Sequence, residues 1–133
     1  MVNKFKKLPD AELDVMKVIW DWPDKIPITT SQIKEQLDNV RVLNILAVHT
    51  LLIRLVERGF LKTFKKDKNR HYEPSIIESD YIAWENKSFL EKLNDNSITK
   101  FITRLYDDKS ITKEDLTELA AFIEEKTKEA NND

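Results

Sequence analysis

The sequence predicts a mainly α-helical fold with one small β-hairpin. Apolar residues recur at helical spacing over most of the 133 residues. The single glycine, Gly59, follows one such helical stripe, at the place where a helix end favours a left-handed residue. After Gly59 the pattern changes to two short strand-like runs, and helical spacing then returns until the end of the chain.

The first helix is expected to begin with Asp10 as its N-cap, because Pro9 precedes it and acidic residues occupy its first turn. The segment Trp22-Pro23-Asp24-Lys25 ends this helix, and a short extended piece follows at residues 26–28. The residues expected on the inward face are Leu13, Met16, Ile19 and Trp20.

Two further helices are expected before the glycine. Thr29 and Gln32 have the spacing of a capping box that opens the second, short helix, and Asn44 can cap the third. Gly59 then ends the third helix, with Phe60 as its hydrophobic partner. The residues expected inside are Ile33 and Leu37 of the second helix and Val48, Leu51, Leu52, Leu55 and Val56 of the third.

The hairpin is expected from strands at 60–65 and 70–73, with Asp67-Lys68-Asn69 as the turn and Pro74 as its end. Three helices are expected to follow, and residues 94–96 and 107–110 separate them. The fourth helix runs from about Glu78 to Leu93, and Thr112 with Asp115 opens the sixth. Tyr81 and Trp84 lie on a different face of the fourth helix from Ile82, Phe89 and Leu93. We therefore expect two domains, at residues 1–75 and 76–133.

Three helices followed by a hairpin form the order of a winged helix-turn-helix, in which the third helix enters the DNA major groove and the hairpin lies along the backbone. The charge distribution fits this interpretation. Through Ser75 the chain has 14 Lys+Arg and 10 Asp+Glu, whereas the remainder has 8 and 14. From Arg54 to Tyr72 there are seven cations and only two anions. Lysines can also protect an exposed hairpin edge, but order and charge together favour DNA binding.

The candidate contacts follow from the period of the third helix. Its outward residues include Leu46, Thr50, Ile53 and Glu57, and apolar side chains are unusual on a DNA-reading face. A protein-interaction module with little specific DNA binding is therefore the alternative function. The candidate base-reading residues are Asn44, Leu46, Ala47, His49 and Thr50. The candidate phosphate contacts are Thr30, Ser31, Arg41, Arg54, Lys65, Lys66, Lys68 and Arg70.

The C-terminal helices predict self-association. A domain of about 60 residues with such short helices would be marginal alone, and pairing would bury its apolar faces. A dimer would place two reader helices on a two-fold operator. The candidate interface residues are Ile98, Phe101, Ile102, Leu105, Leu116, Leu119 and Ile123.

Other classes of protein are disfavoured by composition and motifs. The chain has no cysteine, which excludes disulfides and thiolate metal sites. It has no signal-peptide pattern and no apolar run of membrane-spanning length, so a cytoplasmic protein is expected. It has no phosphate loop, nucleophile elbow or metal-binding pair, and His49 and His71 lack a third ligand at helix spacing. We therefore expect neither an enzyme nor a metal or other cofactor.

Four stretches of the chain form an ordered set: LPDAELDVMKVIW at 8–20, HTLLIRLVERGFLKTFK at 49–65, HYEPSIIESDYIAWENKSFLEKL at 71–93 and SITKEDLTELAAFIEE at 110–125. Through these stretches the sequence resembles the penicillinase repressor family (BlaI/MecI/CopY) over nearly its whole length. This resemblance implies an N-terminal winged helix, a C-terminal helical dimerisation region, a two-fold operator and repression of resistance genes.

The chain also departs from the family pattern. Members usually begin the recognition helix with a Ser- or Thr-Pro-Lys-Thr-type segment, whereas this chain has Asn44-Ile45-Leu46-Ala47. The C-terminal cysteine cluster of the copper-responsive members is absent, which disfavours copper or zinc sensing of that type.

The resemblance further implies a mode of release. In penicillinase repressors a β-lactam-sensing membrane receptor leads to proteolysis at an Asn-Phe bond in the fifth helix. The equivalent bond here is Arg104–Leu105, which differs at both positions. We expect that a cut in this helix would inactivate the protein, that a regulatory protease is a candidate partner beside DNA and a second copy, and that a penicillinase-type receptor is not the trigger.

Overall fold

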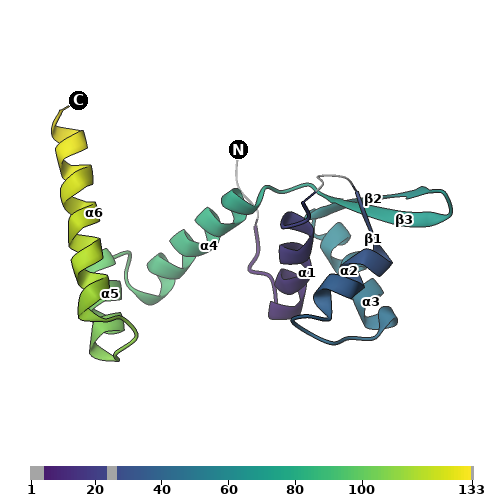
Figure 1. The fold of residues 1–133 in the computed structure, drawn as a ribbon, viewed down its shortest axis with the longest axis horizontal. Helices are drawn as coiled ribbons and strands as arrows, with labels where there is room; N and C mark the ends of the chain where they lie inside the picture. The colour runs from purple at the N-terminus through teal and green to yellow at the C-terminus, as the bar shows by residue number, and fades with distance from the viewer. Residues whose placement is uncertain (1–4, 24–26, 133) are drawn as a thin grey trace. The chain divides into compact units, whose positions relative to one another are not determined.

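The computed structural model describes residues 5–23 and 27–132. The chain forms two compact units, Met1–Glu85 and Asn86–Asp133 (Figure 1). The N-terminal unit contains three helices and a small sheet, and the C-terminal unit is helical. The predicted fold class, mainly α with one hairpin, is confirmed.

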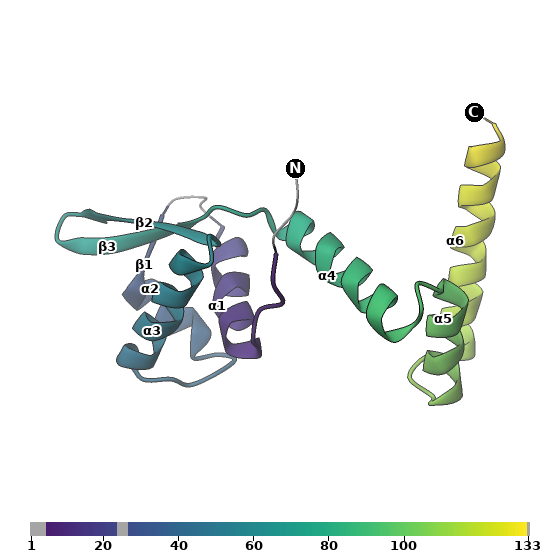
Figure 2. The same ribbon diagram turned by 180° about the vertical axis from the view of Figure 1, so that it is seen from behind.

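The N-terminal unit has the element order of a winged helix. Its elements are α1 (Asp10–Trp20), β1 (Ile28–Thr29), α2 (Thr30–Leu37), α3 (Ile45–Glu57), β2 (Leu61–Lys66) and β3 (Asn69–Pro74), followed by α4 (Glu78–Leu93), which continues into the second unit. The strands form an antiparallel sheet in the order β1-β3-β2. The β2–β3 hairpin projects beyond the three helices in both views (Figures 1 and 2).

The sheet contains one strand that the sequence predicted only as an extended piece. Ile28 pairs with Tyr72 and Thr29 pairs with His71 across the β1–β3 ladder. This short pairing connects the start of α2 to the base of the hairpin. Residues 24–26, which include part of the predicted helix end and of the extended piece, lie outside the described residues.

One hydrophobic core unites the helices and the sheet. The inward stripe predicted for α3 is confirmed, with Val56 half-buried at its edge, and Ile33 and Leu37 of α2 are fully buried. In α1 the pattern differs in part, because Leu13 and Trp20 are only half-buried whereas Val15 is completely buried. The other fully buried core residues are Leu8, Met16, Ile19, Ile28, Phe60, Leu61, Tyr72 and Tyr81.

Most of the predicted helix ends are present. Thr29–Gln32 and Thr112–Asp115 form capping boxes, and the Asn44 side chain accepts a hydrogen bond from the amide of Ala47. The prediction for Asp10 is wrong: Pro9 occupies the N-cap position and Asp10 is the first helical residue. An N-cap residue does not have to form a side-chain hydrogen bond, so Pro can occupy this position. The carboxylate of Asp10, in the first turn, still interacts favourably with the helix dipole.

Gly59 is the left-handed residue that ends α3, with φ +81°. Its amide donates to the carbonyl of Val56, and the amide of Phe60 donates to the carbonyl of Leu55. These two bonds form a Schellman motif, which turns the chain directly from α3 into the first strand of the hairpin.

The first turns of α4 belong to the core of the N-terminal unit. The Tyr81 side chain is 1% exposed, and its hydroxyl accepts a hydrogen bond from the amide of Leu8 at 2.8 Å. Its ring lies 5.5 Å from the ring of Phe60 and 5.9 Å from that of Trp20. Burial raises the pKa of Tyr81 to about 12. The two units therefore divide between Glu85 and Asn86, and not after residue 75 as expected.

The C-terminal unit consists of the rest of α4, α5 (Ile98–Asp107) and α6 (Lys113–Asn131). Among its described residues, 86–132, no hydrophobic side chain is fully buried, and the one buried residue is Asn94. The rings of Phe89 and Phe101 meet edge to face at 5.6 Å. Within residues 5–23 and 27–132, no helix is both long and apolar enough to cross a lipid bilayer.

Candidate nucleic-acid interface

The α3 helix is held by its apolar stripe and presents the opposite face to solvent. Val48, Leu51, Leu52 and Leu55 are buried against the core. Exposed side chains at helical spacing form one continuous stripe, called the reader stripe below: Leu46, His49, Thr50, Ile53 and Glu57. Ile45 and Arg54 are also exposed on this helix, beside the stripe. Ala47, a predicted base-reading residue, is half-buried at the edge of this stripe.

Asn44 has the capping role that the sequence predicted, and this role limits its use as a base-reading residue. Its Oδ1 accepts the amide of Ala47 at 2.8 Å, because the side chain caps α3. A bidentate contact with adenine requires that oxygen as an acceptor as well as the amide nitrogen as a donor. While it caps the helix, Asn44 has its side-chain NH₂ group available for DNA but shares its oxygen.

Thr50 is partly committed too. Its hydroxyl donates to the carbonyl of Leu46 at 3.1 Å, within the helix. The hydroxyl oxygen of this exposed residue still has lone pairs, so Thr50 can accept a hydrogen bond from a base but donates one only by breaking this contact.

The hairpin carries the exposed positive charge that phosphate binding requires. Lys65 and Arg70 lie opposite one another in the ladder, as do Lys66 and Asn69. All of these side chains are exposed, and so are Lys62 and Lys68. Asp67 and Lys68 have φ +53° and +70°, which gives the two-residue turn that matches the twist of a hairpin.

Internal contacts orient the middle of the β2–β3 hairpin, called the wing below. Arg70 donates to the hydroxyl of Thr63 at 3.2 Å, and Thr63 donates to the carbonyl of His71 at 3.0 Å. The rings of Phe64 and His71 stack across the strands with centroids 5.7 Å apart. These contacts stiffen the hairpin and keep its cations beside one another.

Two arginines that contribute to the positive charge of the sequence also hold the fold. The Nε of Arg41, a predicted phosphate contact, binds the Asp14 carboxylate at 3.0 Å and ties the α2–α3 loop to α1. Arg58 lies 3.1 Å from the Glu12 carboxylate, which is almost fully buried. This approach is an ion pair without hydrogen-bond alignment. Sequence patterns gave no sign that Glu12 is buried, because an acidic residue in a first helical turn is usually solvated.

The start of α2 offers a weaker anion site. The capping box uses the amides of Thr29 and Gln32. Thr30 and Ser31 occupy the first two helical positions, whose amides have no partner within a helix. They remain candidate phosphate contacts. Arg54, on α3, is exposed beside the reader stripe.

The apolar residues expected at a dimer interface are incompletely covered within one chain. Ile98 and Ile123 are exposed, at 61% and 53%. The others are half-buried: Phe101, Ile102, Leu105, Leu116 and Leu119. Further exposed apolar side chains of this unit are Phe89, Leu93, Tyr106 and Phe122.

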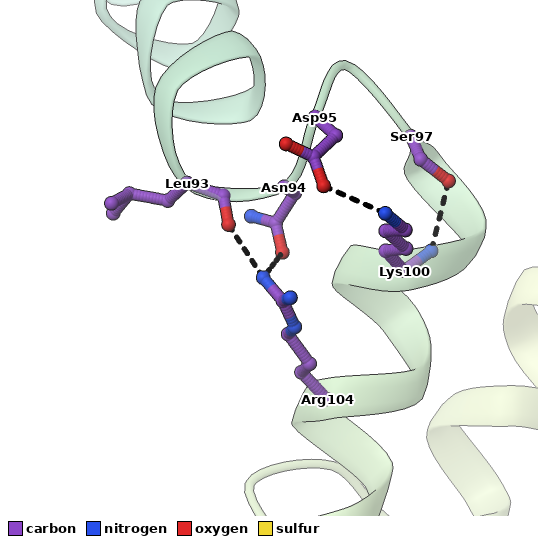
Figure 3. A network of polar contacts seen from close by, with 6 residues as sticks. All are labelled: Leu93, Asn94, Asp95, Ser97, Lys100 and Arg104. Carbon is purple, nitrogen blue, oxygen red and sulfur yellow. Dashed lines mark hydrogen bonds and ion pairs between the residues drawn. The ribbon is translucent and has the colours of Figure 1, made fainter.

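Arg104, one residue of the bond predicted as the cleavage equivalent, joins α5 to the end of α4 (Figure 3). Its guanidinium donates to the carbonyl of Leu93 and to Oδ1 of Asn94, which is 3% exposed. In the turn between α4 and α5, Asp95 forms an ion pair with Lys100 at 2.6 Å. The hydrogen bond from Lys100 and its positive charge lower the pKa of the Asp95 carboxyl. Asp95 and Asn96 adopt left-handed backbone, which turns the chain into α5.

No group of three or more His, Asp or Glu side chains that could hold a metal ion occurs in the part of the chain that the structure describes. His49 and His71 lie on different elements, α3 and β3, and His71 contacts the Phe64 ring and, through Nδ1, the carbonyl oxygen of Asn69.

Comparison with known proteins connects this geometry to a family. The penicillinase repressor of Bacillus licheniformis is 30% identical over 93% of this chain and 94% of its own length. The methicillin resistance regulatory protein MecI of Mammaliicoccus sciuri is 25% identical over 95% of this chain and all of its own length. The solution structure of the DNA-binding domain of the repressor BlaI is similar to 60% of this chain and 94% of its own, with 35% identity and a TM-score of 0.50. The penicillinase repressor family matches residues 8–125, and this chain belongs to that family.

Proposed function

We propose that this protein is a sequence-specific DNA-binding transcriptional repressor that acts as a dimer on a two-fold operator, upstream of resistance or stress genes. The observation that carries the proposal is the reader stripe on α3 beside a hairpin of exposed cations, in a chain that belongs to a family of repressors. Relatives over nearly the whole chain are named as regulators of penicillinase and of methicillin resistance. A repressor of this kind acts in the cytoplasm, where the DNA is.

Specific and nonspecific contacts are expected from different elements. The N-terminal half of α3 would enter the major groove, and the wing would follow the phosphate backbone. Base contacts determine sequence preference, whereas phosphate contacts supply much of the affinity and make it dependent on salt. The proposed phosphate-binding side chains are Arg54, Lys65, Lys66, Lys68 and Arg70.

The dimer is proposed from the C-terminal unit. Its helices leave an apolar surface without a core beneath it, and hydrophobic burial between two copies would stabilise both. Two linked reader helices then bind two half-sites, because the second contact becomes intramolecular.

Release from the operator is proposed to require loss of that linkage. A regulatory protease that cuts between the two units or within α5 would separate the reader helices from each other. The network around Arg104 makes the Arg104–Leu105 bond a poor substrate while α5 is folded, because cleavage requires an extended backbone there.

The alternative function is a winged-helix module that binds protein. Leu46 and Ile53 favour it, because they leave apolar surface on the reader stripe. The cationic hairpin favours DNA, since it offers repeated exposed positive charge in the same unit as that stripe.

The test is selection of binding sites by the full chain from a pool of random-sequence duplex DNA, followed by mobility-shift titration at several salt concentrations. The proposal expects enrichment of a two-fold sequence with half-sites about one helical turn apart, or a multiple of it, and a steep loss of affinity with salt. Equal affinity for all duplexes would refute specific repression and favour the alternative function.

A further inference from the structure

We propose that α3 reads its operator mainly through the C5-methyl groups of thymines, with Leu46 and Ile53 as the residues that determine specificity. This inference rests on the proposed function, that the protein binds operator DNA. It adds the chemistry of the base contact: apolar recognition of A·T pairs in place of hydrogen-bonded recognition of guanine or adenine.

The reader stripe has two exposed apolar side chains, two helical turns apart. Leu46 is 73% exposed and Ile53 is 56% exposed, and they lie on the same face of α3. They are separated by two helical turns, about 11 Å along the axis. Base pairs are stacked about 3.4 Å apart, so a helix that follows the groove would place these two side chains about three base steps apart.

The polar residues of the same helix have little capacity left for hydrogen-bonded reading. The oxygen of Asn44 is engaged in the cap of α3. The hydroxyl proton of Thr50 is donated to the carbonyl of Leu46. Among the exposed side chains between Leu46 and Ile53, His49 is the other polar group that can contact a base edge. The exposed apolar surface of Leu46 and Ile53 is therefore available to read bases by van der Waals contact, beside any hydrogen bond that His49 makes.

Thymine is the base that this chemistry recognises. Thymine is the only standard base that presents a methyl group in the major groove. The position of that methyl group also distinguishes a T·A pair from an A·T pair. Burying one methyl group against a Leu or Ile side chain excludes water from both surfaces. The gain expected from transfer data corresponds to roughly three- to fivefold in affinity for each methyl.

DNA is the occupant that the charges favour. Arg54 lies on α3 beside the stripe, and the wing that follows Gly59 exposes Lys62, Lys65 and Lys66. An apolar strip on a helix, in a unit that also exposes these cations, is complementary to a groove whose floor has methyl groups and whose walls are phosphates. A protein partner would have to supply anions for the same cations, and binding to such a partner is an outcome of the test.

The experiment begins with the duplex that the full chain selects from random-sequence DNA. Each thymine of one half-site is then replaced singly by deoxyuridine, which removes the methyl and leaves every hydrogen-bonding group unchanged. Dissociation constants are measured for the parent, for Leu46→Ala and for Ile53→Ala. Ile77→Ala is the control, because Ile77 is 67% exposed but lies outside α3.

We expect two positions, about three base steps apart, at which deoxyuridine weakens binding by the parent roughly three- to fivefold. At one of them the substitution should have almost no further effect on Leu46→Ala, and at the other almost none on Ile53→Ala, because the methyl then has no large apolar side chain to pack against. Ile77→Ala should behave as the parent.

Two results would overturn the inference in different ways. Methyl reading is wrong, and specific DNA binding stands, if a sequence is selected but no deoxyuridine replacement changes a dissociation constant by more than twofold. The same holds if each deoxyuridine replacement weakens binding by Leu46→Ala and by Ile53→Ala equally. If no sequence is selected at all, the proposed function fails together with this inference, and the stripe is then assigned to a protein partner.

Discussion

Single polar residues in this chain have roles that their local contacts determine more than their type. Arg41 and Arg58 increase the positive charge of the N-terminal half, but each pairs with a carboxylate of α1. The lysines of the hairpin, in contrast, are exposed. A charge count of the sequence therefore includes two arginines that the structure pairs with carboxylates, and it exceeds the number of unpaired cations proposed to contact phosphate.

Tyr81 is the residue whose hydroxyl should contribute most to stability. Tyr81→Phe keeps the ring among Phe60 and Trp20 but leaves the amide of Leu8, in a fully buried residue, without its acceptor. We expect the free energy of unfolding to fall by about 1–3 kcal/mol. Urea denaturation at fixed protein concentration measures this. Tyr106→Phe is the control, since Tyr106 is exposed, and equal losses for both variants would contradict the assignment.

At the scale of the element, the sequence predicted best what neighbouring residues determine. The capping pairs Thr29–Gln32 and Thr112–Asp115 and the left-handed Gly59 depend on contacts within a few residues, so their spacing was sufficient. The pairing of β1 with β3 and the burial of Glu12 depend on partners more than 40 residues away in sequence, on which periodicity carries no information.

The candidate DNA-binding site also has features that the sequence predicted and features that it did not. The exposed positions Leu46, Thr50 and Ile53 follow from helical period alone. The Asn44 cap followed from residue type and position, whereas the hydrogen bond that Thr50 donates within the helix did not, because a Thr hydroxyl can bond either to backbone or to DNA.

The wing should contribute affinity without sequence preference. Replacing Lys66, Lys68 and Arg70 together by Ala removes three exposed cations from the hairpin tip. We expect binding to every duplex to weaken by at least about tenfold, and the salt dependence to flatten by about one unit of slope for each phosphate that the variant no longer binds. Mobility-shift titration between 50 and roughly 200 mM salt measures both.

The matched control for the wing replaces Lys87, Lys92 and Lys113, which are exposed on α4 and α6. It changes the net charge almost equally but leaves the hairpin intact. If the control flattens the salt dependence as much as the wing variant does, the effect belongs to overall charge and the docking of the wing is wrong.

At the scale of the whole molecule, α4 belongs to both units, and this determines where the chain can be divided. A fragment that ends at Glu85 keeps Tyr81 and Trp84 on the core, whereas one that ends at Pro74 loses both. We expect the longer fragment to be a folded monomer that binds the full operator at least about 100-fold more weakly than the full chain, because the second half-site no longer benefits from linkage. We expect the shorter one to lose several kcal/mol of stability, on the order of 3–5 for a buried aromatic residue.

Sedimentation equilibrium and urea denaturation of both fragments beside the full chain distinguish these expectations. A dimeric fragment ending at Glu85 would place the dimer interface in the N-terminal unit. Equal stability of the two fragments would mean that Tyr81 contributes little to the core despite its burial.

Inactivation by proteolysis belongs to the same scale, because it acts by separating two linked reader helices and not by damaging either one. The bond that the resemblance predicts as the cleavage equivalent is Arg104–Leu105, and the Arg104 side chain is held by the carbonyl of Leu93 and by Asn94. A protease adapted to Asn-Phe would meet a long cation and an aliphatic side chain, and it would have to unwind α5 against those contacts. We expect the protein to remain intact when cells are exposed to a β-lactam, as followed by mass spectrometry. A fragment that ends at Arg104 would contradict this expectation and restore the family's mode of release.

As the positive control, a recognition site for a specific protease is introduced in the turn between α5 and α6. Cutting there should divide the C-terminal unit and lower operator affinity toward that of the fragment ending at Glu85, since the apolar faces of α5 and α6 would no longer be joined.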